Sequence, residues 1–294
     1  MLRRPYGRTG LAVPVLGFGA MQVGDPGLDE GTAARLLNDV LDLGLGLIDT
    51  ARSYGLSEER IGRHLADRRD EFVLSTKVGY GVPGVPDWTY DCALAGVDAA
   101  RDRLRTDVID IVHLHSCGLD VLRSGEVVRA LERCRELGKL RVVAYSGDDA
   151  PLGAAVESGG FGGVQASVSV CDQQGLETLL RARVLGLGTI AKRSLAGRPW
   201  SGGTPPADSV HAEYRRRFGA LAAGLDVQCA DWDAISLRFA AYEPGVDCVI
   251  VGGLDARHVE CNLAAVSAGP LPEPLRTELR RRFQRLGGNW RGQV

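Results

Sequence analysis

The most regular feature of the sequence is an alternation of short apolar runs with amphipathic stretches. Eight apolar runs read as strands, and most are nearly continuous, which is typical of parallel strands buried on both faces. The expected strands are Val15–Gly19, Leu45–Asp49, Phe72–Lys77, Ile109–His115, Leu140–Ser146, Gly163–Ser169, Gly188–Lys192 and Cys248–Gly252. Between them apolar residues recur at helical spacing, as at Leu36, Leu37 and Val40. Strands that alternate with helices, without a break in composition, predict a single-domain (β/α)8 TIM barrel over residues 1–294.

Turn and capping residues mark the ends of these elements. The segment before the first strand reads as a small β-hairpin, and residues 197–206, rich in Gly, Pro and Ser, predict a long loop over the barrel mouth. We expect Ser57 and Asp91 to be helix N-caps and Gly138 to be a C-cap. The tail Leu286–Trp290 is expected to be a flexible cover or a frayed end.

Composition narrows the classes of protein that the chain can belong to. A formal net charge of −2 and a pI near 6.2 argue against a nucleic-acid partner or an anionic membrane surface. No apolar run approaches the roughly 18 residues that a membrane span needs. Seven cysteines, an odd number without C-x-x-C spacing, predict reduced thiols and a cytoplasmic location. The oligomeric state is left open.

Three successive strands are expected to end on residues that carry chemistry. Asp49, Lys77 and His115 lie at the C-terminal ends of their apolar runs, and Tyr54 follows in the next loop. In parallel α/β proteins that end of the sheet holds the active site, and adjacent strands lie about 4.8 Å apart. A lysine beside a tyrosine is expected to lower the pKa of the phenol from its usual value of about 10. Tyr54 would then serve as a general acid, while His115 donates a hydrogen bond to a substrate oxygen.

Each of these residues also has an ordinary structural interpretation. Alone, each reads better as a capping aspartate, a surface tyrosine, a paired lysine or a core histidine; the four together in this placement favour an enzyme. His113 and His115 point the same way on one strand, and such a pair can bind zinc. A metal-dependent hydrolase on the same barrel is therefore the alternative enzyme, although no metal ligand is assigned.

The motifs around these residues resemble those of the aldo-keto reductase superfamily. The resemblance rests on Asp-Thr-Ala-x-x-Tyr-Gly from Asp49, on Ser-Thr-Lys ending at Lys77, and on an aspartate five residues before His115. Residues 6–19 look like the family's N-terminal hairpin and first strand, and the segment from Val246 through Asn262 looks like its last strand and helix. The stretch 86–91 is similar to a subgroup of sugar (aldose) dehydrogenases.

The resemblance implies a role for each strand-end residue. It makes Tyr54 the proton donor, which Lys77 and Asp49 tune, and it makes His115 the group that orients the carbonyl. Ser146 and Gln165 are implied to hydrogen-bond the nicotinamide amide. This chain departs from the family pattern where it has Gly147 in place of an asparagine, and Lys192 in place of an aromatic residue that stacks on the nicotinamide. Lys192 and Arg193 are expected to contact the cofactor phosphates or to form an ion pair at the barrel mouth.

The implied site for the adenosine end also departs from the family pattern. Gly252, Gly253 and His258 occupy positions where members that grip a 2′-phosphate often carry Lys, Ser and Arg, and Arg257 lies adjacent. Together with Asn262, these residues are expected to bind the cofactor. NADP(H) is favoured and NAD(H) is the alternative.

The resemblance implies an oxidoreductase that moves a hydride between this cofactor and a small carbonyl compound, an alcohol or an aldose. Trp88 and Trp200 are the expected substrate contacts, because both lie in loops near the barrel mouth. A catalytically idle, cofactor-binding regulatory subunit is the remaining alternative.

Overall fold

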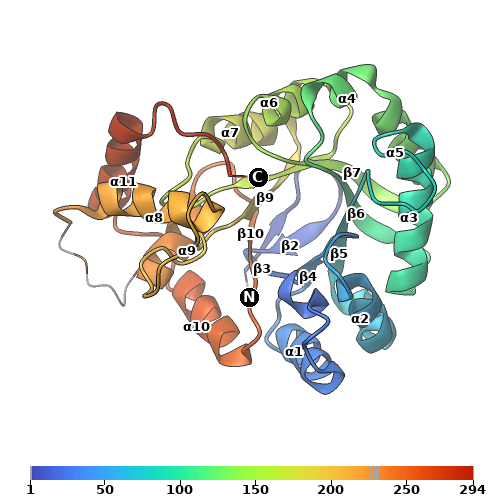
Figure 1. Ribbon diagram of the computed structural model, residues 1–294, viewed down its shortest axis with the longest axis horizontal. Helices are drawn as coiled ribbons and strands as arrows, with labels where there is room; N and C mark the ends of the chain where they lie inside the picture. Colours follow the sequence, from blue (N-terminus) through green and yellow to red (C-terminus); the bar gives the residue numbers. More distant parts are fainter. Residues whose placement is uncertain (1, 226, 228–231, 294) are drawn as a thin grey trace.

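The molecule is built on a closed parallel barrel (Figure 1). The computed structural model describes residues 2–225, 227 and 232–293, and within them eight parallel strands form a ring in which β10 closes against β3. An antiparallel hairpin of β1 (Arg3–Pro5) and β2 (Ala12–Pro14) precedes the ring. The barrel strands are β3 (Leu16–Gly19), β4 (Leu47–Asp49), β5 (Val73–Val78), β6 (Ile109–His115), β7 (Leu140–Ser146), β8 (Gly163–Ser167), β9 (Gly188–Lys192) and β10 (Cys248–Val251).

This architecture confirms the predicted (β/α)8 barrel with an N-terminal hairpin. The bounds of β6, β7 and β9 coincide with the prediction, and the other strands differ by one or two residues at an end. Helices surround the ring, and 3-10 turns lie at Gln22–Gly24 (η1) and Ala66–Glu71 (η2). The helices are α1 (Glu30–Asp42), α2 (Ser57–His64), α3 (Tyr90–Leu104), α4 (Leu119–Ser124), α5 (Glu126–Glu136), α6 (Asp149–Glu157), α7 (Leu176–Leu185), α8 (Val210–Ala222), α9 (Trp232–Tyr242), α10 (Ala256–Ser267) and α11 (Glu273–Leu286).

Two of the expected helix caps are wrong. Ser57 is the first residue of α2 and not the residue before it, and its hydroxyl donates to the Ala20 carbonyl at 2.8 Å and accepts from Thr50, so no side chain caps this helix start. Helix α3 is capped by Thr89, whose hydroxyl accepts from the Cys92 amide, and not by Asp91. Gly138 has φ +73° just after α5, the left-handed conformation expected at a helix end.

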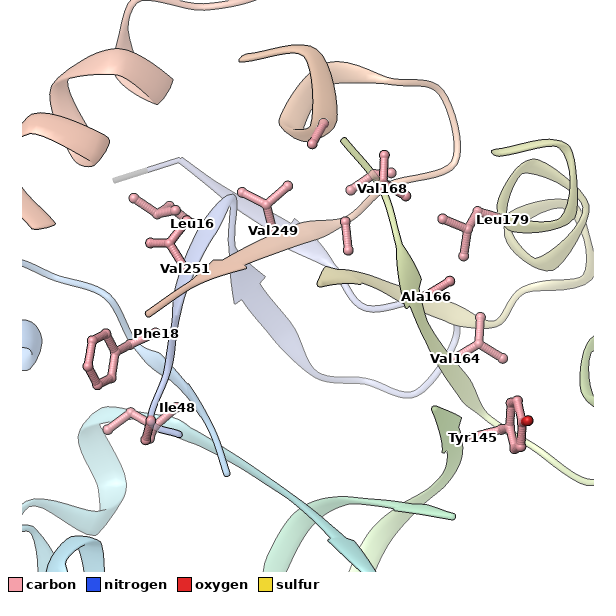
Figure 2. Close-up of a cluster of buried hydrophobic side chains, with 14 of the residues drawn as sticks. Leu16, Phe18, Ile48, Tyr145, Val164, Ala166, Val168, Leu179, Val249 and Val251 are labelled. Atoms are coloured by element: carbon pink, nitrogen blue, oxygen red, sulfur yellow. The ribbon is translucent and has the colours of Figure 1, made fainter. Parts of the chain in front are cut away.

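Alternation along each strand separates two cores. Residues that point outward from the barrel pack against the helices, and Figure 2 shows such side chains, among them Phe18, Val164 and Val249. Residues that point inward at the lower, N-terminal end of the strands form a second apolar cluster with Tyr6 of the hairpin. Tyr6 closes this end so tightly that a Cβ on Gly188 would lie 2.4 Å from its ring. Each large apolar side chain buried in this way stabilises the fold by about 1.5–3 kcal/mol.

The C-terminal tail returns to the barrel after α11 (Figure 1). The Gln174 side-chain amide donates to the carbonyls of Gly287 and Trp290, at 2.6 and 3.0 Å, and the Gly292 amide donates to the Asp149 carboxylate. The expectation of a frayed end is therefore wrong. In the part of the chain that the structure describes, no helix combines the length and the apolar character needed to span a membrane.

Candidate active site

The predicted strand-end residues meet at the upper, C-terminal end of the barrel. Asp49 ends β4, Lys77 is the penultimate residue of β5 and His115 ends β6. In the ladder, Asp49 lies opposite Ser75 and His115 lies opposite Ser146. Because alternate residues of a strand share a face, all of these side chains point into the barrel above the apolar cluster.

Lys77 and Asp49 form a buried ion pair in which each residue is 2% exposed. The ammonium also donates to the Thr50 carbonyl at 2.8 Å, and the carboxylate accepts from Ser75 at 2.7 Å and from Gln165 at 3.1 Å. Burial raises the pKa of Asp49, but Lys77 and these donors outweigh burial and lower it. Burial likewise lowers the pKa of Lys77, and Asp49 together with Tyr54 raises it above its ordinary value. Both groups therefore stay charged.

Tyr54 lies over this pair, held by a close approach between two glycines. The Lys77 ammonium is 5.1 Å from the centre of the Tyr54 ring. A Cβ on Gly24 would lie 1.6 Å from the Tyr54 carbonyl oxygen, and a Cβ on Gly55, which has φ +52°, would lie 2.3 Å from the Gly24 carbonyl oxygen. Only glycine fits these two positions, so the backbone fixes the place of the phenol.

The pKa of Tyr54 is raised, and the expected lowering is wrong in direction. Burial raises this pKa, and it outweighs the charge and the hydrogen bond of Lys77, which lower it. The phenol is therefore protonated at neutral pH and holds a proton that it can donate. The positive charge of Lys77 lowers the free-energy cost of removing that proton. A residue that both donates and takes back a proton needs this support.

The histidines of β6 occupy two levels of the barrel. The rings of His115 and Tyr54 meet edge to face, with their centroids 5.9 Å apart. Burial, followed by the charge of Lys77, lowers the pKa of His115 to about 3, so its imidazole is neutral. His113 is fully buried one layer deeper, and burial lowers its pKa to about 4. Among the residues that the structure describes, no group of three or more His, Cys, Asp or Glu side chains could hold a metal ion, so the histidine pair has no third ligand there.

Two cavities lead away from Tyr54 along the barrel mouth. The first, of 370 Å³, is bounded by Asp49, Tyr54, Arg193 and Gly252, and the second, of 470 Å³, lies beyond it. Both touch Leu195, Arg198 and Gly252, so they are continuous. Four of the residues predicted to bind the adenosine end line the second cavity: Gly252, Gly253, His258 and Asn262. Together the cavities offer an elongated site that starts at Tyr54 and is long enough to be a candidate site for a dinucleotide.

The family model for the Aldo/keto reductase family matches residues 15–275. The chain belongs to this family. It is 27% identical over 281 residues to L-galactose dehydrogenase from Arabidopsis thaliana, an alignment that covers 90% of this chain and 88% of the relative. It is 33% identical over 166 residues to D-threo-aldose 1-dehydrogenase from Pseudomonas sp, covering 46% of this chain and 50% of that protein. The holo form of the aldo-keto reductase AKR11C1 from Bacillus halodurans superposes with a TM-score of 0.81 at 25% identity, covering 96% of each chain.

Membership makes this aldo/keto reductase an NAD(P)-dependent oxidoreductase of a family that acts on small carbonyl compounds. Its departure from the family pattern at Lys192 has a structural explanation. Lys192 pairs with Asp148 at 2.9 Å, and Asp148 is fixed by the amide and the hydroxyl of Ser167. Lys192 was expected either to contact the cofactor phosphates or to form an ion pair at the barrel mouth, and the structure shows the ion pair. Arg193, with φ +57°, lines the first cavity.

Other predicted residues of this aldo/keto reductase divide into two groups. Ser146 donates to Gln165 at 2.9 Å, and Gln165 reaches Asp49, so both lie in the site. Arg257 lies in an exposed ion pair with Asp255. Trp200 packs against Phe218 and Trp232, and its indole donates to Asp233, so it helps to pack the loop; its contact with substrate stays a prediction.

Tyr80 is a site residue that sequence reasoning missed. Its ring lies between Trp88 and His115, with centroid distances of 5.4 and 5.5 Å, and its hydroxyl is 3.0 Å from His115 Nδ1. With Tyr54, these side chains form an aromatic row along one wall of the site. The available signal was an aromatic residue three positions after Lys77, just beyond the end of β5.

Proposed function

We propose that this aldo/keto reductase interconverts a small aldehyde, ketone or aldose with its alcohol, with Tyr54 as the general acid and base. The observation that carries the proposal is the placement of the Tyr54 phenol over the buried Lys77–Asp49 pair, next to a neutral His115. A bound nicotinamide would supply the hydride in reduction and accept it in oxidation. Every other part of the chemistry falls to side chains of this chain.

In reduction, the Tyr54 hydroxyl donates its proton to the substrate oxygen as that oxygen gains negative charge. The tyrosinate that results is stabilised by the Lys77 ammonium, whose own charge is held by Asp49. His115 is neutral and donates a hydrogen bond that orients the same oxygen. In oxidation the tyrosinate takes the hydroxyl proton of the alcohol, and the same hydrogen bonds operate.

The two cavities support a cofactor laid along the barrel mouth, with the nicotinamide at Tyr54. Ser146 and Gln165 would hold its amide, and Arg193 would meet the phosphates. The adenosine end would lie among Gly252, Gly253, His258 and Asn262, with Arg257 at the rim. NADP(H) is the proposed form, since the exposed Arg257–Asp255 pair contributes little stability and can open to a 2′-phosphate; NAD(H) is the alternative.

A sugar is the proposed substrate class within the carbonyl compounds. Two relatives are named L-galactose dehydrogenase and D-threo-aldose 1-dehydrogenase. The rings of Trp88 and Tyr80 pack next to each other beside His115, and the proposal places the apolar face of a sugar ring, or an aromatic aldehyde, against them.

The test measures oxidation of NADPH and of NADH with an activated aromatic aldehyde and with aldoses, in the wild type and in Tyr54→Phe. Turnover should fall about 10²–10⁴-fold in the variant while cofactor binding, followed by tryptophan fluorescence, is retained. Tyr90→Phe, at the start of α3, is the matched control and should leave the rate unchanged.

Two results would contradict the proposal. Cofactor binding without any turnover in the wild type would favour a regulatory subunit. NAD(P)H oxidation that survives Tyr54→Phe but is lost on treatment with a zinc chelator would show that the reaction depends on a metal ion and not on Tyr54.

A further inference from the structure

The two ring nitrogens of His115 have different surroundings. Nδ1 is 3.0 Å from the Tyr80 hydroxyl, which in turn is 3.1 Å from the hydroxyl of Ser53. The rings of Tyr80 and His115 are stacked, with an angle of 28° between their planes. Because Tyr80 occupies Nδ1, Nε2 is the nitrogen left to meet a substrate oxygen.

A neutral imidazole carries one proton, so one of its nitrogens donates and the other accepts. A carbonyl oxygen accepts hydrogen bonds only, so His115 can orient it only when the proton is on Nε2. Nδ1 must then accept, and the Tyr80 hydroxyl must donate to it. A hydroxyl can donate one hydrogen bond and accept another, so Tyr80 can accept from the exposed Ser53 hydroxyl at the same time.

We propose that Tyr80 is a positioning residue that donates its hydroxyl proton to His115 Nδ1 and thereby fixes the tautomer in which Nε2 carries the hydrogen that meets the substrate oxygen. This inference rests on the proposed function for its consequence in catalysis. The tautomer itself is a property of the protein without cofactor or substrate. The Tyr80 hydroxyl lies within donating distance of both Ser53 Oγ, at 3.1 Å, and His115 Nδ1, at 3.0 Å; the proposal assigns its single proton to Nδ1, with Ser53 donating to Tyr80 in turn.

The loop that carries Tyr80 is built to hold it still. Gly79 has φ +131°, and a Cβ there would lie 2.2 Å from the Trp88 ring, so the indole packs directly on the backbone. The Trp88 amide donates to the Gly79 carbonyl at 2.7 Å, and the Arg52 guanidinium donates to the Gly81 carbonyl at 2.9 Å. Trp88 has φ +61°, a strained conformation that persists only where the surroundings impose it. Tyr80 is thus clamped between Trp88 and His115.

The decisive experiment reads the tautomer directly. Protein labelled with ¹⁵N at histidine is observed by long-range ¹H–¹⁵N NMR, which distinguishes protonated from unprotonated ring nitrogens. The chain has five histidines, so the His115 signals are assigned by their loss in His115→Asn. The wild type should show the proton on Nε2. Tyr80→Phe keeps the stacked ring but removes the donor, and its His115 signals should move toward a mixture of the two tautomers.

Activity gives a second, independent measurement. In Tyr80→Phe, kcat/KM should fall about 5–10-fold, the effect of one hydrogen bond, while the limb of the pH profile that depends on Tyr54 keeps its position. Tyr90→Phe should change neither the NMR pattern nor the rate, and a melting curve shows whether Tyr80→Phe is folded. Ser53→Ala should keep the Nε2 proton, because it leaves the Tyr80 donor in place.

Two outcomes would overturn the inference. One is a wild-type His115 with its proton on Nδ1, and the other is a tautomer that does not change in folded Tyr80→Phe. Because the NMR experiment needs no turnover, failure of the proposed reaction would be seen separately, as activity that does not depend on Tyr54.

Discussion

The lower and upper ends of the barrel interior are made by the same strands but have opposite character. At the lower end, inward positions such as Leu47, Ile111 and Ile190 are apolar and buried around Tyr6. Two residues further along their strands, Asp49 and Lys192 point into the barrel mouth, and Ile111 is followed at that spacing by His113. A strand can therefore change from core to site within two residues. The difference teaches that stability and chemistry are layered along one axis, so each can be perturbed separately.

The largest effect is expected from removing the Lys77–Asp49 ion pair at the upper end of the barrel interior. Lys77→Met should lower turnover about 10²–10⁴-fold. Because it leaves Asp49 buried without its partner, it should also lower the free energy of unfolding by about 3–5 kcal/mol, measured by urea denaturation. Lys77→Met combined with Asp49→Leu should recover most of the stability and none of the activity. A double variant as unstable as the single one would show that lost packing, and not an unpaired charge, causes the instability.

The next largest effect is expected from the apolar cluster around Tyr6, at the lower end of the barrel interior. Ile111→Ala should cost about 2–5 kcal/mol of unfolding free energy, because it leaves a cavity in the apolar cluster. Its kcat for the folded protein should stay within about a factor of two of the wild type, since the Ile111 side chain belongs to the apolar cluster and not to the layer of Asp49, Lys77 and His115. A rate that falls in proportion to stability would contradict the separation of the two layers.

A smaller effect is expected on the free energy of unfolding at acidic pH. The folded-state pKa of His113 is lowered to about 4, below the unfolded value of about 6.5, so the unfolded chain binds more protons in this window. The stability that neutral His113 supports is complete above the unfolded pKa and is lost as pH falls toward 4. His113→Gln should reduce the pH dependence of unfolding free energy by about 1.4 kcal/mol per pH unit between pH 6 and 4.5. Ile111→Val, in the lower layer, should leave that slope unchanged, and an unchanged slope in His113→Gln would contradict the prediction.

The sequence predicted most of the fold and the heart of the site because both follow from local pattern. Strands β6, β7 and β9 are largely apolar runs that each end on a polar residue, His115, Ser146 or Lys192, so their C-terminal ends could be predicted. Asp49, Lys77 and His115 were found because each ends such a run. The direction of the Tyr54 pKa was wrong because it depends on how far burial outweighs Lys77, a balance that only the three-dimensional surroundings set.

Other features depend on contacts between segments that lie far apart in sequence. Tyr80 was missed because its role arises only when the loop after β5 folds back on Trp88 and brings its hydroxyl to His115. Ser57 was misread as a cap because its hydroxyl is used by Ala20, outside its own helix. Lys192 has one ion-pair partner among the several that sequence allowed, and only the tertiary structure selects Asp148.

The pairing of β10 with β3 sets an order of events for a chain that emerges from the ribosome. β3 is made early, and its outer edge has no strand to pair with until residues 248–251 have been synthesised. During that interval the nascent chain exposes a hydrogen-bonding edge of the kind that recruits other strands and leads to aggregation. Gly252, which joins the two cavities, directly follows the strand that closes the ring. Capture of a dinucleotide would therefore be available only to chains in which residues 248–253 have been synthesised and β10 has paired with β3.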